Sequence, residues 1–346
     1  MNEFALGERR IGRDYPPLVI AEIGINHDGQ MDKAIQLVNA AAAAGAEVVK
    51  FQCHITETEM IRTEIKPGLA NDNIWDIIKR CELTEDEEME LKEYCERKNM
   101  IYLSTPFSRE TSDRLERLGV LAYKIGSGEC NNLPLLRHVA RKGKPIILST
   151  GMNDLQSIHE SVSVIREFNV PFALMHCTSI YPTPYAKVRL GAIDEITKTF
   201  PNIPVGLSDH SLNIWTCLGA VAMGCSILEK HFTISRKWPG PDITVSIEPH
   251  ELGDLITGAH AIWEARGGNK NILEEEQSVI DFAYSTVVTI RPVRKGEVFT
   301  EDNIWVKRPG TGPIRARDLY HIIGKTAACD IPAHKHLHPQ HIIGFD

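Results

Sequence analysis

The chain has 346 residues, of which 42% are hydrophobic and 24% are charged, and its formal net charge is −8 at pH 7. This length suits one large domain, or one large and one small domain, and the acidic balance argues against broad binding to nucleic acid or to an anionic membrane surface. No apolar run reaches the roughly 18 residues of a membrane span, the start lacks the apolar core of a signal peptide, and the eight cysteines form no CxxC pair, so we expect a cytoplasmic protein with reduced thiols.

Eight short apolar runs each end in small or polar residues, and each is followed by a segment with helical periodicity. The predicted strands are residues 18–23, 48–51, 101–104, 122–125, 145–148, 172–175, 204–207 and 226–228. Residues 53–73 form a long insertion with little pattern, of the kind that often binds or covers a ligand. After it, Thr84 and Glu87 form a capping box at the start of the helix expected over residues 83–99.

Eight buried strands alternating with helices predict a TIM (β/α)8 barrel, in which the strands are covered on both faces. A doubly wound open sheet is the alternative, but no G-x-G-x-x-G follows the first strand and the order shows no break. After residue 268 the pattern changes. We therefore expect a TIM-barrel catalytic domain over residues 1–268, a linker over 269–284 and a small β-rich domain over 285–346.

Two histidines follow the last two predicted strands, His210 in GLSDH and His231 in LEKHF. If these strands are parallel neighbours joined by a crossover helix, both side chains leave the same edge of the sheet, about 4.8 Å apart. Two imidazoles could then share a metal ion that keeps open positions for water and substrate. The alternative is a pair of polar loop histidines without a ligand.

Lysines and hydroxyl groups also gather at the strand ends. Lys50 and Lys124 end the second and fourth strands, and Thr105, Ser127 and Ser149 follow the third, fourth and fifth. Two ammonium groups with directional hydroxyl and backbone donors make a phosphate site. The alternative is that both lysines are simply solvated at the rim.

Carboxylates accompany this ring. Glu22 and Glu129 face the same end of the predicted barrel, where each could act as a general acid or base or could form a salt bridge to Lys50 or Lys124. Asp242, in PGPD, lies in the loop after the eighth strand, and its alternative role is to cap the next helix.

Ten motifs in order, from about residue 4 to the end of the chain, resemble those of the sialic acid synthase family, above all the bacterial N-acetylneuraminate synthases. The motifs are EIGINH, VVKFQ, STPFS, YKIGSGECNN, ILSTGMN, HCTSIYPTP, GLSDH, LEKHFT, PGPD and NIWVKRPGTG. The resemblance implies a TIM barrel followed by an antifreeze-like (SAF) domain.

The resemblance also implies a reaction. Phosphoenolpyruvate adds through its C3 to the aldehyde of an open-chain N-acetylhexosamine, normally N-acetylmannosamine, water attacks C2, and phosphate leaves with C–O cleavage. His210 and His231 match the two histidines that hold a divalent ion in this family, usually Mn²⁺, with Mg²⁺ or Co²⁺ as substitutes. The ion acts there as a Lewis acid on the aldehyde oxygen.

Further residues carry over by position. The family's phosphoenolpyruvate contacts fall on Lys50, Thr105, Lys124, Ser127, Ser149 and Ser179, the last of which is usually asparagine in the bacterial enzymes. Its sugar-side residues fall on Gln52, Tyr181, Asp242 and Arg308, and Glu22 matches a candidate acid or base. Arg308 corresponds to an arginine that the SAF domain of one subunit delivers to its partner's barrel, which implies a homodimer with exchanged C-terminal domains.

Two rival functions remain open. The same chemistry on a 2,4-diacetamido-trideoxyhexose would give legionaminic or pseudaminic acid, and the residue types of the pocket do not decide between these sugars. A non-catalytic barrel that binds an acidic sugar is a third possibility, which predicts the loss of metal or phosphate residues. Of these residues only position 179 departs from the family pattern.

Overall fold

The structure, a computed structural model, describes residues 3–67 and 72–345. Residues 68–71 of the expected insertion lie outside this description. The chain divides into two compact units, Met1–Gly267 and Gly268–Asp346.

Eight parallel strands form one sheet in the first unit. They are β3 (Leu18–Gly24), β4 (Val48–Cys53), β5 (Ile101–Pro106), β6 (Tyr123–Ile125), β7 (Ile146–Ser149), β8 (Phe172–Cys177), β9 (Val205–Asp209) and β10 (Ile227–His231). Their order is β5-β4-β3-β10-β9-β8-β7-β6, and the outer strands β5 and β6 are also in contact. The sheet is therefore a nearly closed barrel, which confirms the predicted TIM fold.

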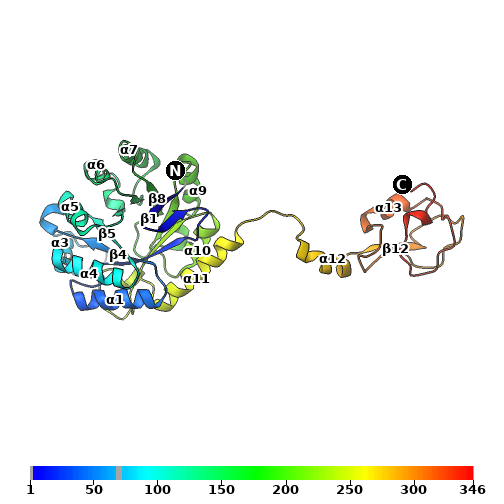
Figure 1. The fold of residues 1–346 in the computed structure, drawn as a ribbon, viewed down its shortest axis with the longest axis horizontal. Coiled ribbons are helices and arrows are strands. Elements are labelled where there is room, and N and C mark those ends of the chain that lie inside the picture. Colours follow the sequence, from blue (N-terminus) through cyan, green and yellow to red (C-terminus); the bar gives the residue numbers. More distant parts are fainter. Residues whose placement is uncertain (1–2, 68–71, 346) are drawn as a thin grey trace. The chain divides into compact units, whose positions relative to one another are not determined.

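Helices surround the strands on the outside, as Figure 1 shows. They are α1 (Met31–Ala43), α2 (Thr56–Glu59), α3 (Ile74–Cys81), α4 (Glu85–Arg97), α5 (Arg109–Leu118), α6 (Leu133–Ala140), α7 (Leu155–Arg166), α8 (Tyr185–Val188), α9 (Gly191–Thr199), α10 (Trp215–Ala222) and α11 (Pro249–Ala265). The capping box of Thr84 and Glu87 at the start of α4 is confirmed. Helix α2 lies in the insertion, where the sequence shows little pattern, and α3 directly follows it.

A hairpin that the sequence analysis did not anticipate closes the amino-terminal end of the barrel. Strands β1 (Glu3–Leu6) and β2 (Arg9–Gly12) pair in antiparallel, and three of their side chains join a buried apolar cluster. That cluster takes one residue from the beginning of several barrel strands, including Leu18, Val48 and Ile227. Polar chemistry is thereby confined to the opposite end, the mouth of the barrel.

Alternation along the strands decides which side chains reach the mouth, because neighbouring residues of a strand point to opposite faces. In β10, Glu229 and His231 point into the barrel, whereas Lys230 points outward and bonds with Asp209. In β4, Lys50 and Gln52 point inward, and Phe51 packs outside against Tyr102. The side chain of Phe51 therefore lies away from the mouth.

The second unit has its own apolar core. It contains α12 (Gln277–Ala283), α13 (Leu319–Ile322) and two antiparallel strands, β11 (Thr286–Thr289) and β12 (Ile304–Lys307). Isolated bridges and turns make up most of the rest, so the unit has less regular β-structure than its composition suggested. The expected linker contains a 3-10 turn, η3 (Glu274–Glu276), and α12. Within residues 3–67 and 72–345, no helix has the length and apolarity to cross a membrane.

Candidate active site

Two lysines and two glutamates form a buried quartet at the base of the mouth. The Nζ atom of Lys50 lies 2.8 Å from Glu22 Oε2 and 3.9 Å from Glu229 Oε2. The Nζ atom of Lys124 lies 3.6 Å from Glu229 Oε1. Lys50 and Lys124 are only 3% and 2% exposed, so the alternative of solvated lysines is wrong. Glu22 forms the salt bridge that its alternative reading named, and it still faces the mouth.

Burial and mutual attraction set the charges of this quartet. Burial raises the pKa of Glu22 to about 7, and Lys50 opposes the rise. Burial alone would also raise the pKa of Glu229, but Lys124 and Lys50 outweigh it and lower that pKa. Burial lowers the pKa of Lys124, whereas Glu22 and Glu229 outweigh burial at Lys50 and raise its pKa. Glu22 is therefore the member poised to exchange a proton near neutral pH.

Hydroxyl groups of the predicted ring bond to both lysines. Lys50 Nζ donates to Thr105 Oγ1 over 3.2 Å, and Lys124 Nζ donates to Ser149 Oγ over 2.6 Å. These four side chains come from β4, β5, β6 and β7. They form an anion site of two cations with directional hydroxyl groups beside them.

The remaining two serines of the ring meet around Gly151. The backbone N–H of Gly151 donates to Ser127 Oγ over 3.0 Å. A Cβ atom at this glycine would lie 2.5 Å from Ser179 Oγ and 2.8 Å from Ser127 Oγ. An alanine at position 151 would therefore displace at least one of these two hydroxyl groups.

The two histidines converge at the carboxyl ends of β9 and β10. The ring centroids of His210 and His231 lie 5.3 Å apart, and both side chains are buried. His210 Nδ1 lies 3.0 Å from the carbonyl oxygen of Thr178, to which it can donate only if it carries the proton. In the neutral form of His210, that bond leaves Nε2 with a free lone pair.

These residues fit a metal ion. Nδ1 of His231 is buried and has no hydrogen-bond partner among the described residues, and burial lowers the pKa of this imidazole well below its ordinary value. A neutral imidazole is the form that binds metals, and a backbone carbonyl on the other ring nitrogen is a common support for a ligand histidine. No group of three or more histidine, cysteine or carboxylate side chains that could hold a metal occurs in the part of the chain that the structure describes. The expected site has only the two histidines.

The sugar-side residues of the barrel meet at the same rim. A Cβ atom at Gly24 would lie 3.1 Å from Glu22 Oε1, 3.3 Å from Gln52 Nε2 and 3.4 Å from Asp242 Oδ2. The ring of Tyr181 lies 4.0 Å from that of His210. Asp242 makes no side-chain cap bond and instead lies 3.6 Å from His231 Nδ1, so the capping alternative is wrong.

Two expected residues lie elsewhere. Glu129 does not pair with a lysine and accepts a hydrogen bond from Asn132. Arg308 belongs to the second unit, where its guanidinium carbon lies 5.8 Å from the centre of the Phe282 ring.

Sequence reasoning missed Glu229, because the eighth strand was expected to end at residue 228. Its position two residues before His231 was the available signal, since residues two apart on a strand share a face. It also missed the buried ion pair of Asp209 and Lys230, whose Nζ and Oδ2 atoms lie 2.6 Å apart. These two residues stand next to the two histidines in sequence and tie the ends of β9 and β10 together.

Two family models match this chain. The model of the NeuB family matches residues 37–271, and that of the SAF domain matches residues 284–343. This chain belongs to the NeuB family. The predictions of a sialic acid synthase family, of an enzyme and of an SAF domain after the barrel are thereby confirmed.

Relatives of this NeuB-family chain include named synthases. The N,N'-diacetyllegionaminic acid synthase of Campylobacter jejuni is 37% identical over 320 residues, covering 90% of this chain and 95% of that protein. Human N-acetylneuraminate-9-phosphate synthase is 30% identical and covers 92% of this chain and 90% of its own length. Among solved structures, the N-acetylneuraminic acid synthetase of Leptospira borgpetersenii in complex with citrate has a TM-score of 0.74 and 34% identity, covering 80% of this chain and 95% of that one.

Proposed function

We propose that this chain condenses phosphoenolpyruvate with N-acetylmannosamine to give N-acetylneuraminate, with release of inorganic phosphate. The observation that carries the proposal is the juxtaposition of a buried two-lysine anion site with a convergent histidine pair in one barrel mouth. An anionic enol phosphate and a sugar aldehyde need these two kinds of group side by side.

The lysines hold the phosphoenolpyruvate. Lys50 and Lys124 neutralise its negative charge, and Thr105 and Ser149 direct hydrogen bonds at its oxygens. In the reaction, a bond forms between C3 of the enol and the aldehyde carbon, water adds to C2, and the bond from C2 to the phosphate oxygen breaks. Glu22 takes the proton of this water at Oε1, the oxygen that faces the mouth.

His210 and His231 would hold a divalent ion, for which we propose Mn²⁺, with Mg²⁺ or Co²⁺ as substitutes. When bound, such an ion supplies Lewis-acid polarisation of the sugar aldehyde. Gln52, Tyr181 and Asp242 bind the sugar from the surrounding loops. The convergence of Glu22, Gln52 and Asp242 on the space beside Gly24, where a Cβ atom would lie, supports this role because it gives the rim several donors and acceptors.

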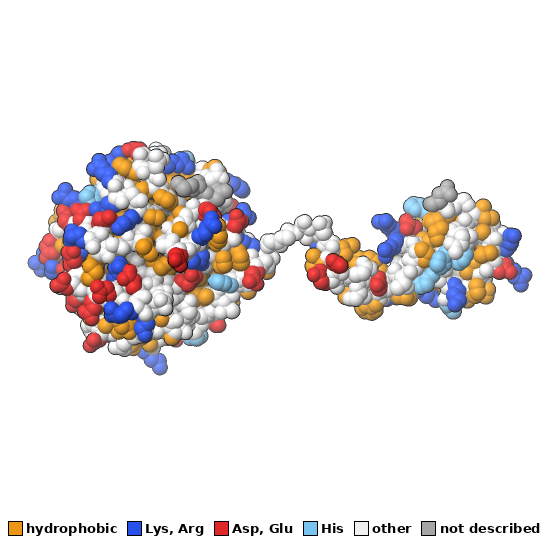
Figure 2. Space-filling view, in the orientation of Figure 1, with side chains coloured by type: hydrophobic (Ala, Val, Ile, Leu, Met, Phe, Trp, Pro, Cys, Tyr) orange, Lys and Arg blue, Asp and Glu red, His pale blue; other side chains and the backbone are white. Residues whose placement is uncertain are grey.

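We also propose a homodimer in which the second unit of one chain supplies Arg308 to the barrel of the other. Support comes from exposed apolar side chains on and around α12, which Figure 2 shows as a hydrophobic patch. They are Ile272, Leu273, Val279, Phe282 and Tyr284. Apolar groups gathered in this way mark an interaction surface.

A cytoplasmic location suits the eight cysteines, which are all free.

A second candidate function is the synthesis of N,N'-diacetyllegionaminic acid from a 2,4-diacetamido-trideoxyhexose. The 37% identity to the Campylobacter jejuni enzyme favours it. Both proposed reactions would use the same lysine quartet and the same histidine pair of this chain, so they differ only in the acceptor sugar.

A substrate panel tests both candidates. Purified protein with Mn²⁺ and phosphoenolpyruvate is given N-acetylmannosamine, its 6-phosphate or 2,4-diacetamido-trideoxymannose, and phosphate release and product mass are measured. We expect release with one unphosphorylated sugar, its loss on chelation, and its loss in His210→Ala and His231→Ala. Absence of phosphate release with all three sugars refutes the proposed function.

A further inference from the structure

A buried histidine outside the expected site bonds to Gln52. His54 follows the end of β4, and its Nε2 atom lies 3.0 Å from Gln52 Oε1. Its Nδ1 atom lies 3.0 Å from both carboxylate oxygens of Glu59, the last residue of α2. The side chains of His54 and Glu59 are only 2% and 4% exposed, and the imidazole stacks on Phe107 with 4.4 Å between ring centroids.

The hydrogen-bonding capacities of Glu59, His54 and Gln52 limit where protons can lie between them. An amide oxygen and a carboxylate can only accept, so the arrangement in which Gln52 turns its oxygen toward His54 requires a donor at both nitrogens of the ring. The NH2 group of Gln52 then points the other way and lies 3.3 Å from Glu22 Oε1. If the amide turned over while both nitrogens of His54 kept their protons, NH2 would face an N–H of His54 and that bond would be lost.

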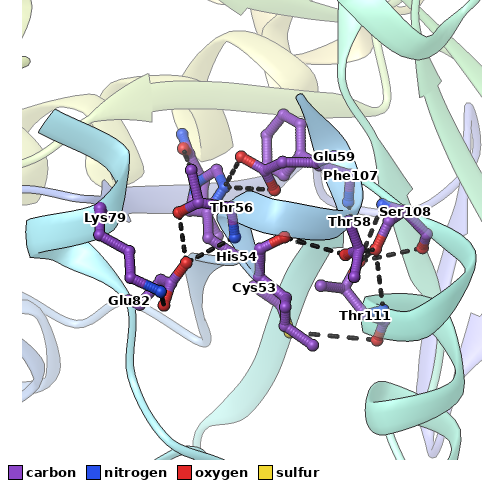
Figure 3. Close-up of polar contacts among 12 residues, drawn as sticks. Cys53, His54, Thr56, Thr58, Glu59, Lys79, Glu82, Phe107, Ser108 and Thr111 are labelled. Carbon is purple, nitrogen blue, oxygen red and sulfur yellow. Dashed lines mark hydrogen bonds and ion pairs between the residues drawn. The ribbon is translucent and has the colours of Figure 1, made fainter. Parts of the chain in front are cut away.

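The short helix that carries Glu59 is held on two sides, as Figure 3 shows. On one side, the backbone N–H and hydroxyl group of Thr56 donate to Glu82, whose carboxylate also pairs with Lys79. On the other side, Thr58 Oγ1 donates to Ser108 Oγ over 2.9 Å. Glu59 is therefore fixed relative to the barrel and can fix His54 in turn.

We propose that His54 and Glu59 are positioning residues that turn the Gln52 amide so that its NH2 group faces the mouth of the barrel. The inference rests on the proposed function, in which Gln52 binds the sugar. It adds the chemistry of the contact: the sugar must offer an acceptor there, a hydroxyl oxygen or an acyl carbonyl oxygen.

The variant Glu59→Gln tests the inference because it keeps the shape and removes the charge. A neutral His54 with its proton on Nδ1 has a lone pair on Nε2, and the Gln52 amide then turns over and offers an oxygen where the sugar needs a donor. The matched control is Glu88→Gln, since Glu88 is equally buried and pairs with Arg114 at 3.2 Å without contacting Gln52. Nitrogen NMR of histidine-labelled protein reports the protonation of His54, and His54→Asn identifies its signals.

In Glu59→Gln we expect the KM for the sugar to rise about tenfold or more, and the KM for phosphoenolpyruvate to change by less than about twofold. The control leaves both constants within that margin, and NMR shows two protonated nitrogens in the parent protein and one in the variant. An unchanged sugar KM, an equal rise of both KM values, or a singly protonated His54 in the parent protein overturns the inference. If the parent protein turns over no sugar, the proposed function fails, and the NMR result alone then decides the state of His54.

Discussion

Replacing Glu229 with glutamine tests whether the lysine quartet is a preformed anion site. The Glu229 carboxylate is the anion that stands between the two lysines, 3.6 Å from Lys124 and 3.9 Å from Lys50. Glutamine keeps the shape of this side chain but removes its charge. The variant leaves two buried ammonium groups with Glu22 as their only close carboxyl group in the quartet.

The cost follows from the distances. At an effective dielectric constant of about 20, unit charges at these separations attract each other by about 4–5 kcal/mol per pair. Burying a neutral amide costs less than burying a carboxylate, which offsets part of the lost attraction. The net cost of breaking a buried ion pair is about 3–5 kcal/mol of stability. For a domain of this size, each kcal/mol lowers Tm by about 2–4 °C, so we expect Tm to fall by roughly 6–20 °C.

Phosphoenolpyruvate should reverse much of this loss, because it brings negative charge to the same two lysines. In the parent protein its charge is repelled by Glu229, and in Glu229→Gln it is not. Thermal unfolding with and without phosphoenolpyruvate, beside isothermal titration, measures the effect. We expect the variant to bind phosphoenolpyruvate about threefold more tightly or better, and to gain more in Tm from it than the parent protein does.

The control is again Glu88→Gln, a buried ion-pair variant outside the mouth. It should lose stability without any added response to phosphoenolpyruvate. Equal stabilisation of all three proteins by phosphoenolpyruvate, or an unchanged Tm for Glu229→Gln, refutes the reasoning about the quartet.

Three further predictions concern single residues of the barrel. The folded pKa of Glu22 lies at about 7, above its ordinary value of 4.5, so the native state holds this proton more firmly and stability falls as pH rises between these values. Glu22→Gln should therefore remove a pH-dependent loss of stability on the order of 3 kcal/mol. The measurement is Tm against pH, and a profile unaltered by the substitution contradicts the prediction. In Gly24→Ala, the φ angle of 55° and the crowded Cβ position should destabilise the barrel by about 1–2 kcal/mol and raise the sugar KM, so normal kinetics count against a sugar site at this rim. Asp209→Asn breaks the buried bond to Lys230 and should cost about 3–5 kcal/mol and weaken Mn²⁺ binding in titrations without substrate; full Mn²⁺ affinity would show that the pair does not hold the histidines in place.

Apolar patterning was enough to find the barrel, because a strand buried on both faces needs an apolar run wherever it occurs in the chain. All eight runs are strands in the structure, and the helix after Thr84 begins with the capping box that its letters indicate. The hairpin β1–β2 was not predicted, because its two strands of four residues are too short to show a hydrophobic periodicity. Helix α2, with four residues, escaped for the same reason.

The site residues likewise fall into those that a local sequence pattern predicts and those that it does not. His210, His231, Lys50 and Lys124 stood out because charged or titratable groups at strand ends are visible in the letters. Glu229 did not, because the eighth strand was expected to end at residue 228. Its spacing from His231 indicates the face on which it lies, but its place between lysines from β4 and β6 depends on how the strands pair around the barrel.

The hairpin at the amino-terminal end of the barrel limits how molecules reach the site. Phe4, Leu6 and Ile11 fill that end with apolar side chains, which leaves the carboxyl ends of the strands as the way in. In the proposed reaction both substrates must therefore arrive, and both products leave, at the end of the barrel where the lysines and the histidines lie.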